Sequence, residues 1–224
     1  MEQNNIISVA GYLTNEANAV LLPLLNPSEL TVIAARPGIG KTTLAVNIAI
    51  HYASHKHITT GIFYLELSIE PHTQIFLRSV NFPLPSELFI NDTPGITVSE
   101  IHQKCREIKD THDLGLVVID CFQLISRGNE NIQNTAAQLK DMTLDLCVPV
   151  IVTSQLSRSC EERRDHRPRM TDFGESGALA DIADNVVLLY REEYYRPDIG
   201  KPGECELIIA KSKNNNKNGG NFNE

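Results

Sequence analysis

Segments long and apolar enough to cross a membrane are missing from this sequence of 224 residues. Its longest apolar runs, such as residues 20–25 and 148–152, are far shorter than the roughly 20 residues that span a bilayer. Residues 1–20 also lack the basic start and the apolar middle of a signal peptide. We therefore expect a soluble cytoplasmic protein with no membrane partner.

Cysteine patterns typical of disulfide frameworks or metal sites are lacking as well. The five cysteines are odd in number, scattered, and never spaced as C-x-x-C. Three of them lie inside apolar runs, where cysteine behaves as a small hydrophobic residue. The histidines at 51, 55 and 57 have no cysteine or carboxylate at ligand spacing. We expect reduced, structural cysteines and a solvated helix end carrying these histidines.

Positive charge is scarce, because 20 lysines and arginines face 28 acidic residues and the formal net charge is −8. This balance argues against a surface devoted wholly to nucleic acid. A ring-shaped motor needs positive charge only along its channel, so DNA binding stays open. Basic residues gather in two stretches, for which solvated loops are the other interpretation: Arg158, Arg163, Arg164, Arg167 and Arg169, and then Lys211, Lys213 and Lys217.

From residue 30 onwards, short apolar strands alternate with amphipathic helices. Thr97, with Glu100 three residues later, forms a capping-box pattern that predicts a helix start. The alternation predicts an α/β fold, a mostly parallel sheet flanked by helices on both faces. Strands are expected at 31–35, 62–67, 88–90, 116–119, 148–153, 185–190 and 204–210, and helices at 41–54, from 97 onwards, and at 135–146. Residues 1–28 read as a lead-in segment, 29–213 as one domain, and 214–224 as a flexible Asn/Gly-rich tail.

One motif joins an expected strand to an expected helix: Ala35-Arg36-Pro37-Gly38-Ile39-Gly40-Lys41-Thr42, followed by Thr43. It matches the phosphate-binding pattern G-x-x-x-x-G-K-[ST], except that alanine holds the first position. Gly38 and Gly40 let the backbone wrap phosphate oxygens, and the helix start attracts the anion. Lys41 should reach the β- and γ-phosphates, and the Thr42 hydroxyl should bind magnesium. A nucleoside triphosphate with magnesium is therefore expected at residues 36–43, a coincidental glycine-rich turn being the alternative.

Three polar residues are expected in or at the ends of apolar strands. Asp120 follows four apolar residues, at the edge where parallel sheets bind ligands, and should hold magnesium. Capping of the next helix is its other interpretation. Glu66 lies in an otherwise apolar strand, where a charge is costly unless it is used, and is the leading candidate for general base. Gln155 ends another apolar strand and is placed to sense the γ-phosphate.

With these residues in place, the sequence from about 30 to 213 resembles the C-terminal motor domain of DnaB-type replicative helicases, a RecA-like P-loop NTPase. The resemblance rests on six motifs in order: ARPGIGKT at 35–42, LELS at 65–68, LFINDTPG at 88–95, VIDCFQL at 118–124, SQLSR at 154–158 and LYREEYY at 189–195. It implies ATP hydrolysis with Mg²⁺ between the subunits of a homo-hexameric ring. It also implies single-stranded DNA in a central channel near Gly174, Glu175, Ser176 and Gly177, and a primase or loader as partner. Lys211 and Lys213 would reach the neighbouring subunit's ATP, which makes Lys213 a catalytic candidate.

Several features depart from the family pattern. Lys213 stands where the family has a trans-acting arginine, and lysine offers a point charge instead of a planar, bidentate fork. Gly174 replaces an arginine that precedes Glu-Ser-Gly in the family. The stretch 71–87 looks shorter than the family's helical insertion, and residues 1–28 are too few for its N-terminal domain.

Two main hypotheses follow. The first is the motor domain of an ATP-dependent 5′-to-3′ DNA helicase, which couples hydrolysis to translocation on single-stranded DNA during replication. The second is a RecA-like ATP-binding module that regulates or loads another machine without unwinding. A P-loop small-molecule kinase would need a lid and an acceptor pocket, neither of which the sequence shows clearly.

Overall fold

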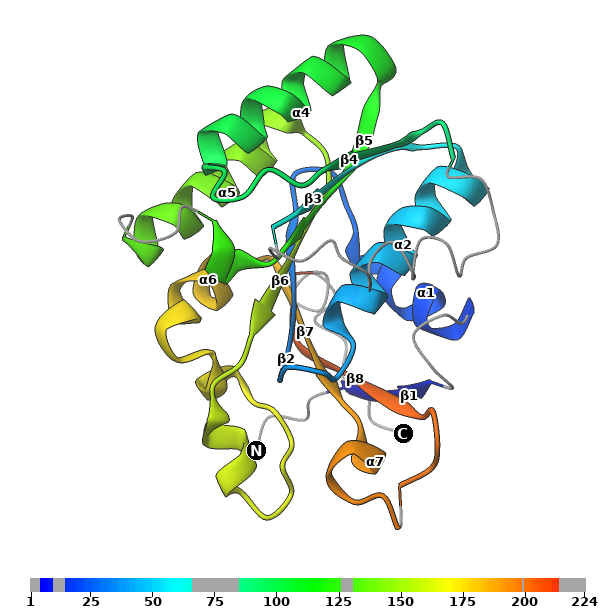
Figure 1. The fold of residues 1–224 in the computed structure, drawn as a ribbon, viewed down its shortest axis with the longest axis vertical. Helices are drawn as coiled ribbons and strands as arrows, with labels where there is room; N and C mark the ends of the chain where they lie inside the picture. The colour runs from blue at the N-terminus through cyan, green and yellow to red at the C-terminus, as the bar shows by residue number, and fades with distance from the viewer. Residues whose placement is uncertain (1–4, 10–14, 66–84, 126–130, 199, 214–224) are drawn as a thin grey trace.

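The computed structural model describes residues 5–9, 15–65, 85–125, 131–198 and 200–213. Three features named above therefore lie outside the described residues: Glu66, most of the stretch 71–87, and the predicted tail 214–224. Figure 1 shows the arrangement of the described part, a twisted sheet with helices on both of its faces. The predicted fold class is confirmed.

The described strands form an eight-stranded sheet in the order β1-β8-β7-β2-β6-β5-β3-β4. Neighbouring strands from β7 through β4 are parallel, whereas β8 runs antiparallel to both β7 and β1. Their bounds are β1 Asn5–Val9, β2 Leu30–Ala35, β3 Thr59–Tyr64, β4 Leu88–Asn91, β5 Leu114–Asp120, β6 Val150–Gln155, β7 Asn185–Tyr190 and β8 Cys205–Ser212. Because the parallel strands share a direction, their carboxyl ends meet at one edge of the sheet, where α/β proteins bind ligands.

The helices form a layer on each face of this sheet. Figure 1 shows α4, α5 and α6 on one side, and α1 and α2 on the other. The helices are α1 Asn15–Leu21, α2 Lys41–Lys56, α4 Val98–His112, α5 Ile132–Leu146, α6 Gly177–Ile182 and α7 Glu192–Tyr195. Short 3-10 turns, η1 Leu22–Leu24, η2 Phe122–Leu124, η3 Arg158–Glu162 and η4 Met170–Ser176, join several of them.

The core divides into two clusters because successive strand side chains point to opposite faces. Val117 and Ile119 of β5 pack with α4, α5 and α6, whereas Leu116 and Val118 pack with α1 and α2. Each of these four side chains is fully buried. A strand covered on both faces has no polar side, which explains the continuous apolar run that ends at Asp120.

Several element boundaries differ from the prediction by one to three residues, among them β5, which begins at Leu114, and β6, which covers Val150–Gln155, and side-chain hydrogen bonds explain the two largest differences. The expected strand 62–67 begins earlier, as β3 does at Thr59. The hydroxyls of Thr59 and Thr60 donate to the carbonyls of His112 and Ile58, so these polar residues can be buried in a strand. Likewise α5 begins at Ile132, because the Asn131 side chain accepts a hydrogen bond from the backbone N–H of residue 133. By contrast, the capping box of Thr97 and Glu100 is confirmed.

The segment 1–28 contributes directly to this fold. Strand β1 pairs with β8 in register from Asn5↔Ile209 to Val9↔Cys205. Ala17 and Leu21 of α1 are buried in the cluster that contains α2. Within the described residues, no helix has the length and apolar character needed to span a membrane.

All five cysteines are present as thiols, and four of them are buried. Burial raises the pKa of the Cys105 thiol to about 12, so this residue acts as a core hydrophobic residue and not as a nucleophile. The rings of His51 and His55 on α2 stack with their centroids 4.9 Å apart. Among the described residues, no group of three or more His, Cys, Asp or Glu side chains is placed to hold a metal ion.

Candidate nucleotide site

The phosphate loop lies between β2 and α2, at the carboxyl edge of the sheet (Figure 1). Gly38 has φ 78° and Gly40 has φ 113°, a region that residues with a Cβ rarely adopt. Gly40 is the N-cap of α2, so the helix begins directly after the loop and its first N–H groups remain available to an anion. The backbone therefore has the conformation that wrapping a phosphate requires.

The remaining loop residues anchor this conformation. Ile39 is buried in the core beside α2. The Arg36 side chain makes two contacts with the segment after β6. Its Nε pairs with Glu161 at 2.8 Å, and its Nη1 donates to the Leu156 carbonyl at 2.8 Å. Pro37 is exposed and Thr43 is half-buried. Arg36 and Ile39 thus anchor the loop, whereas Gly38 is exposed.

Thr42 and Asp120 meet beneath the loop. The Thr42 hydroxyl lies 2.9 Å and 3.1 Å from the two carboxylate oxygens of Asp120. Asp120 is the last residue of β5, it is 1% exposed, and it also accepts a hydrogen bond from the Thr153 hydroxyl of β6. The structure therefore brings a buried carboxylate from one strand to the first turn of the phosphate-loop helix.

This pair of side chains suits a magnesium ion. Mg²⁺ prefers oxygen ligands, and it commonly takes one or two carboxylates together with substrate phosphates and water. One hydroxyl and one carboxylate within hydrogen-bond distance of each other form such a set. The protein would supply part of the coordination shell and the phosphates of a nucleotide would complete it.

Lys41 is the first residue of α2, and its side chain is largely buried at 7% exposure. Among the described residues, no carboxylate forms an ion pair with it. A largely buried ammonium group is stabilised by a nearby anion, and a phosphate bound at this loop would supply one.

Gln155 ends β6 and pairs with Ala35, the first residue of the phosphate loop. The N–H of Leu156 donates to the Ala35 carbonyl at 3.0 Å, which continues this pairing. Glu66 lies outside the described residues. Its chain neighbour Leu65 donates a backbone N–H to the Asp120 carbonyl at 2.6 Å, and Tyr64 pairs with Asp120.

Gln123 was not identified from the sequence, although it lies within the VIDCFQL motif. Its side-chain amide makes hydrogen bonds to the backbone of Gln155 and to the hydroxyls of Ser154 and Ser176. These partners are 31 to 53 residues away along the chain. No local sequence pattern predicts such contacts, because they form only when β6 and η4 pack beside η2 in the folded chain.

Lys213 lies at the other edge of the sheet. Strand β8 is antiparallel to β7, so its end at Ser212 faces Asn185, the start of β7. A strand of six residues, the length of β2, spans about 20 Å. Lys213 is therefore remote from the phosphate loop of its own chain.

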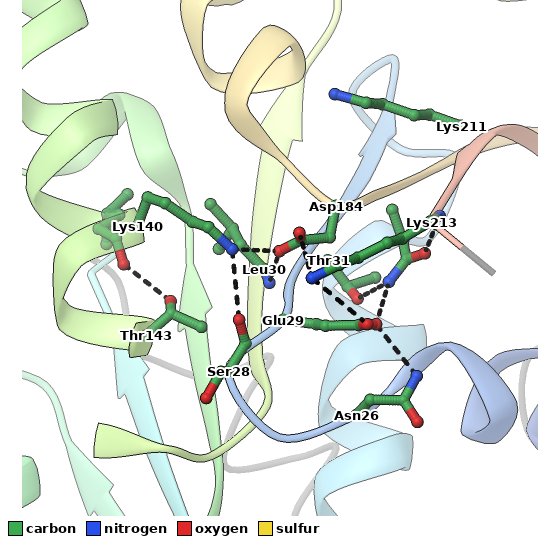
Figure 2. A network of polar contacts seen from close by, with 12 residues as sticks. Asn26, Ser28, Glu29, Leu30, Thr31, Lys140, Thr143, Asp184, Lys211 and Lys213 are labelled. Atoms are coloured by element: carbon green, nitrogen blue, oxygen red, sulfur yellow. Dashed lines mark hydrogen bonds and ion pairs between the residues drawn. The ribbon is translucent and has the colours of Figure 1, made fainter. Parts of the chain in front are cut away.

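The Lys213 ammonium group is engaged in an ion-pair network within its chain (Figure 2). It lies 3.1 Å from Asp184 and 3.7 Å from Glu29, and Asp184 also binds Lys140 and the Leu30 N–H. Burial favours the neutral carboxyl group of Asp184, but its hydrogen bonds outweigh burial and lower its pKa. The contact with Asp184 in turn raises the pKa of Lys213. Both groups are therefore charged at neutral pH.

Lys211 makes different contacts in the same region. Its ammonium group donates to the carbonyls of Asp181 at 2.6 Å and Ala180 at 3.3 Å, in the last turn of α6. A cation at the carboxyl end of a helix satisfies carbonyls that lack a helical partner. Figure 2 places Lys211 apart from the ion pairs of Lys213.

The arginine cluster of the sequence surrounds a pocket of about 580 Å³, lined by Arg163, Arg164, Asp165, Arg167, Arg169, Glu192 and Arg196. Two of these arginines hold the fold together, since Arg163 pairs with Asp172 and Arg167 pairs with Glu206. Arg158 and Arg164 are exposed, as is Glu175 in the expected channel loop. The cluster therefore combines structural ion pairs with charge that faces solvent.

Replacing Asp172 with asparagine should lower the free energy of unfolding by about 3 kcal/mol at neutral pH, because Arg163 would lose a buried partner. Asp172 is 1% exposed and accepts hydrogen bonds from Arg163, Ser159 and the Arg169 N–H. Burial alone would raise the pKa of Asp172, but these donors outweigh burial and lower that pKa. Its contribution is thus complete above the unfolded-state pKa of about 4 and is lost as pH falls through the lowered value.

Urea denaturation at several pH values measures this effect. Asp165→Asn is the matched control, because Asp165 pairs with Arg169 at 3.2 Å and more distantly with the same Arg163 at 3.9 Å. Asp165 is far more exposed than Asp172, and such pairs contribute at most about 1 kcal/mol. Equal stabilities of the Asp172 and Asp165 variants at pH 7 would contradict the assignment.

The sequence matches the family described as DnaB-like helicase C terminal domain over residues 21–82 and 78–221. It is 38% identical over 222 residues to the replicative DNA helicase DnaB of Geobacillus stearothermophilus, covering 84% of this chain and 48% of that protein. It is 37% identical over 219 residues to the replicative DNA helicase DnaC of Bacillus subtilis, again covering 84% and 48%. The chain thus spans about half the length of these relatives.

Solved structures give the same picture. The ATPase domain of G40P superposes with a TM-score of 0.72 at 28% identity, covering 84% of this chain and 78% of that one. A DnaB-like replicative helicase, from a study of its interactions with primase, superposes with a TM-score of 0.73 at 27% identity, covering 87% and 55%. A KaiC-like protein of Pyrococcus horikoshii shares the fold at 18% identity and a TM-score of 0.63. The fold is that of RecA-like ATPase domains, and these likenesses imply nucleotide binding.

Proposed function

Because the chain belongs to the DnaB-like helicase C-terminal domain family, we propose that it is the ATP-hydrolysing motor domain of a replicative DNA helicase, which moves along single-stranded DNA. The observation that carries this proposal is the contact of Thr42 with Asp120 beneath a phosphate loop whose glycines have positive φ. A loop that only binds an anion has no need of a buried carboxylate at the first turn of the helix. A loop that presents a triphosphate to a metal ion does need one.

The site residues divide the work of hydrolysis. The backbone of residues 36–41 and the Lys41 ammonium group bind and orient the β- and γ-phosphates. Thr42 and Asp120 would hold Mg²⁺, which would neutralise developing charge on the phosphate oxygens. Glu66 acts as general base towards the attacking water. Gln155, paired with the first residue of the loop, senses whether the γ-phosphate is present.

The proposal includes a ring of identical subunits. A site at the carboxyl edge of one chain would be completed by Lys213, at the opposite edge of the next chain. The remoteness of Lys213 from its own phosphate loop supports this role, since only a neighbour's nucleotide would lie within its reach. Single-stranded DNA would run along the loop that contains Glu175 and Gly177, and a primase or loader would bind the assembled ring.

Lys213→Arg should raise ATP turnover of the assembled protein by at least about tenfold, since a trans arginine contributes on the order of a thousandfold in related motors. Arginine keeps the positive charge that pairs with Asp184 and Glu29 and adds a bidentate fork for phosphate. Steady-state ATPase assays above the assembly concentration measure the change. Lys56→Arg, at the exposed end of α2, is the control. Assembled Lys213→Arg protein with unchanged turnover would remove this position from the mechanism.

Turnover measured with and without single-stranded DNA, alongside native mass spectrometry with ATP, tests the proposed function. We expect hexamers and a rate that rises several-fold with DNA. Binding of ATP with no turnover under any DNA condition would overturn the motor and identify a regulatory or loading module. Turnover without any response to DNA would leave an ATPase that is not a DNA motor.

A further inference from the structure

The side chain of Gln123 connects three separate elements at the carboxyl edge of the sheet. It belongs to η2, directly after the strand that ends at Asp120. Its amide reaches the end of β6 at Ser154 and Gln155, and it reaches Ser176 at the end of η4. Gln123 itself is exposed, whereas Ser154 and Ser176 are buried. A surface side chain therefore joins the metal strand, the sensor strand and the proposed DNA loop.

The orientation of this amide is determined by its partners. Oε1 accepts the Gln155 N–H at 3.2 Å, and only an oxygen can meet that donor. Nε2 then donates towards the Gln155 carbonyl at 3.2 Å. Gln155 has Ala35 of β2 as its strand neighbour on one side. On the other side the β5–β6 pairing extends only to Ile119↔Val152, so there the Gln123 amide takes the place of a strand neighbour. The backbone position of the sensor residue thus depends on Gln123.

Competition at Nε2 links this position to the loop. The Ser154 hydroxyl lies 2.9 Å from Nε2, the Ser176 hydroxyl 3.1 Å and the Gln155 carbonyl 3.2 Å. An amide nitrogen has two protons, so it cannot bond fully to all three acceptors at once. A shift of Ser176 changes how strongly Nε2 binds the Gln155 carbonyl. Ser176 is the last residue of η4, which is kinked at Gly174 with φ 55°, so a shift of residues 174–177 would move Ser176 as well.

We propose that Gln123 is a positioning residue through which single-stranded DNA on the 174–177 loop controls the γ-phosphate sensor Gln155. DNA bound at this loop displaces Ser176, the amide redistributes its two protons, and the Gln155 backbone shifts relative to the phosphate loop. This inference rests on the proposed function, because it assigns the route by which DNA stimulates ATP turnover. Gln123 itself touches neither the nucleotide nor the DNA, and it acts through its contacts with Ser176 and Gln155.

Two substitutions remove different parts of this hydrogen-bond network. Ser176→Ala removes only the hydrogen bond between Gln123 and Ser176, and Gln123→Met removes all four hydrogen bonds of the amide while the side chain keeps nearly the same size. Each should lower the stimulation of turnover by single-stranded DNA by about fivefold, the change expected for one lost hydrogen bond. In both variants the fall should be larger for DNA-stimulated turnover than for turnover without DNA, which a merely structural role would not produce. Gln133→Met, an exposed position on α5, is the matched control and should keep full stimulation.

The double variant, which combines Gln123→Met with Ser176→Ala, tests whether the two residues act through the same contact. If both residues act through one contact, the combined variant loses no more stimulation than the stronger single variant. Thermal midpoints should match wild type, since the Gln123 side chain is exposed. Full stimulation in both single variants would overturn the proposal, and so would equal losses of basal and stimulated turnover with a lower thermal midpoint. A wild-type chain that does not respond to DNA would overturn the proposed function instead.

Discussion

Replacing Lys41 with alanine is expected to lower ATP turnover by about 100- to 1,000-fold, the usual effect of removing a preorganised group that stabilises transition-state charge. Lys41 begins α2, is 7% exposed and follows a glycine with φ 113°. Its ammonium group is held in a largely dry position at a helix start, where its attraction for phosphate is strong. Water cannot replace that charge after truncation.

The comparison that isolates this effect uses the other end of the same helix. Lys56→Ala removes an exposed lysine from the last turn of α2, so helix propensity and net charge change equally in the two variants. Turnover should fall only in Lys41→Ala, and both thermal midpoints should stay near wild type. A Lys41→Ala protein that retains half of the wild-type rate would exclude Lys41 from catalysis.

Replacing Asp120 with asparagine should lower turnover by about 100-fold or more, because the metal's stabilisation of phosphate charge amounts to several kcal/mol. Asparagine keeps the size of the side chain and one oxygen that can accept from Thr42 or Thr153. It loses the negative charge that binds Mg²⁺. The defect should therefore appear in metal-dependent steps and not in folding.

Nucleotide binding measured with Mg²⁺ and with a chelator separates these contributions. Wild-type affinity for ATP should rise with Mg²⁺, and Asp120→Asn should show little of that rise. Asp110→Asn, an exposed carboxylate on α4, should behave as wild type. An unchanged response to Mg²⁺ in Asp120→Asn would mean that Asp120 only holds the hydroxyls of Thr42 and Thr153 and does not hold the metal.

Much of the fold follows from the sequence because local signals agree with tertiary packing. The run before Asp120 is wholly apolar since helices cover both faces of β5, and the capping box at Thr97 starts α4 as predicted. The start of β3 was predicted wrongly because Thr59 and Thr60 look polar until their hydroxyl partners are known. Pairing of β1 with β8 joins the two ends of the described chain, which no local pattern encodes.

The candidate site divides in the same way. The phosphate loop is one contiguous motif, and Asp120 ends an apolar strand, so both have local signatures. The contacts of Gln123 and the ion pairs of Lys213 with Glu29 and Asp184 join residues far apart in the chain. Their partners depend on strand order and register, which the sequence does not state.

The most direct test is a structure of the chain with Mg²⁺ and a non-hydrolysable ATP analogue. The triphosphate should lie along residues 36–43, with Mg²⁺ between the Thr42 hydroxyl and the Asp120 carboxylate and with Glu66 facing the γ-phosphate. In an assembled ring, Lys213 of the adjacent subunit should approach the same phosphate. A metal ion bound away from Asp120, or a Glu66 side chain directed away from the γ-phosphate, would contradict the proposed motor.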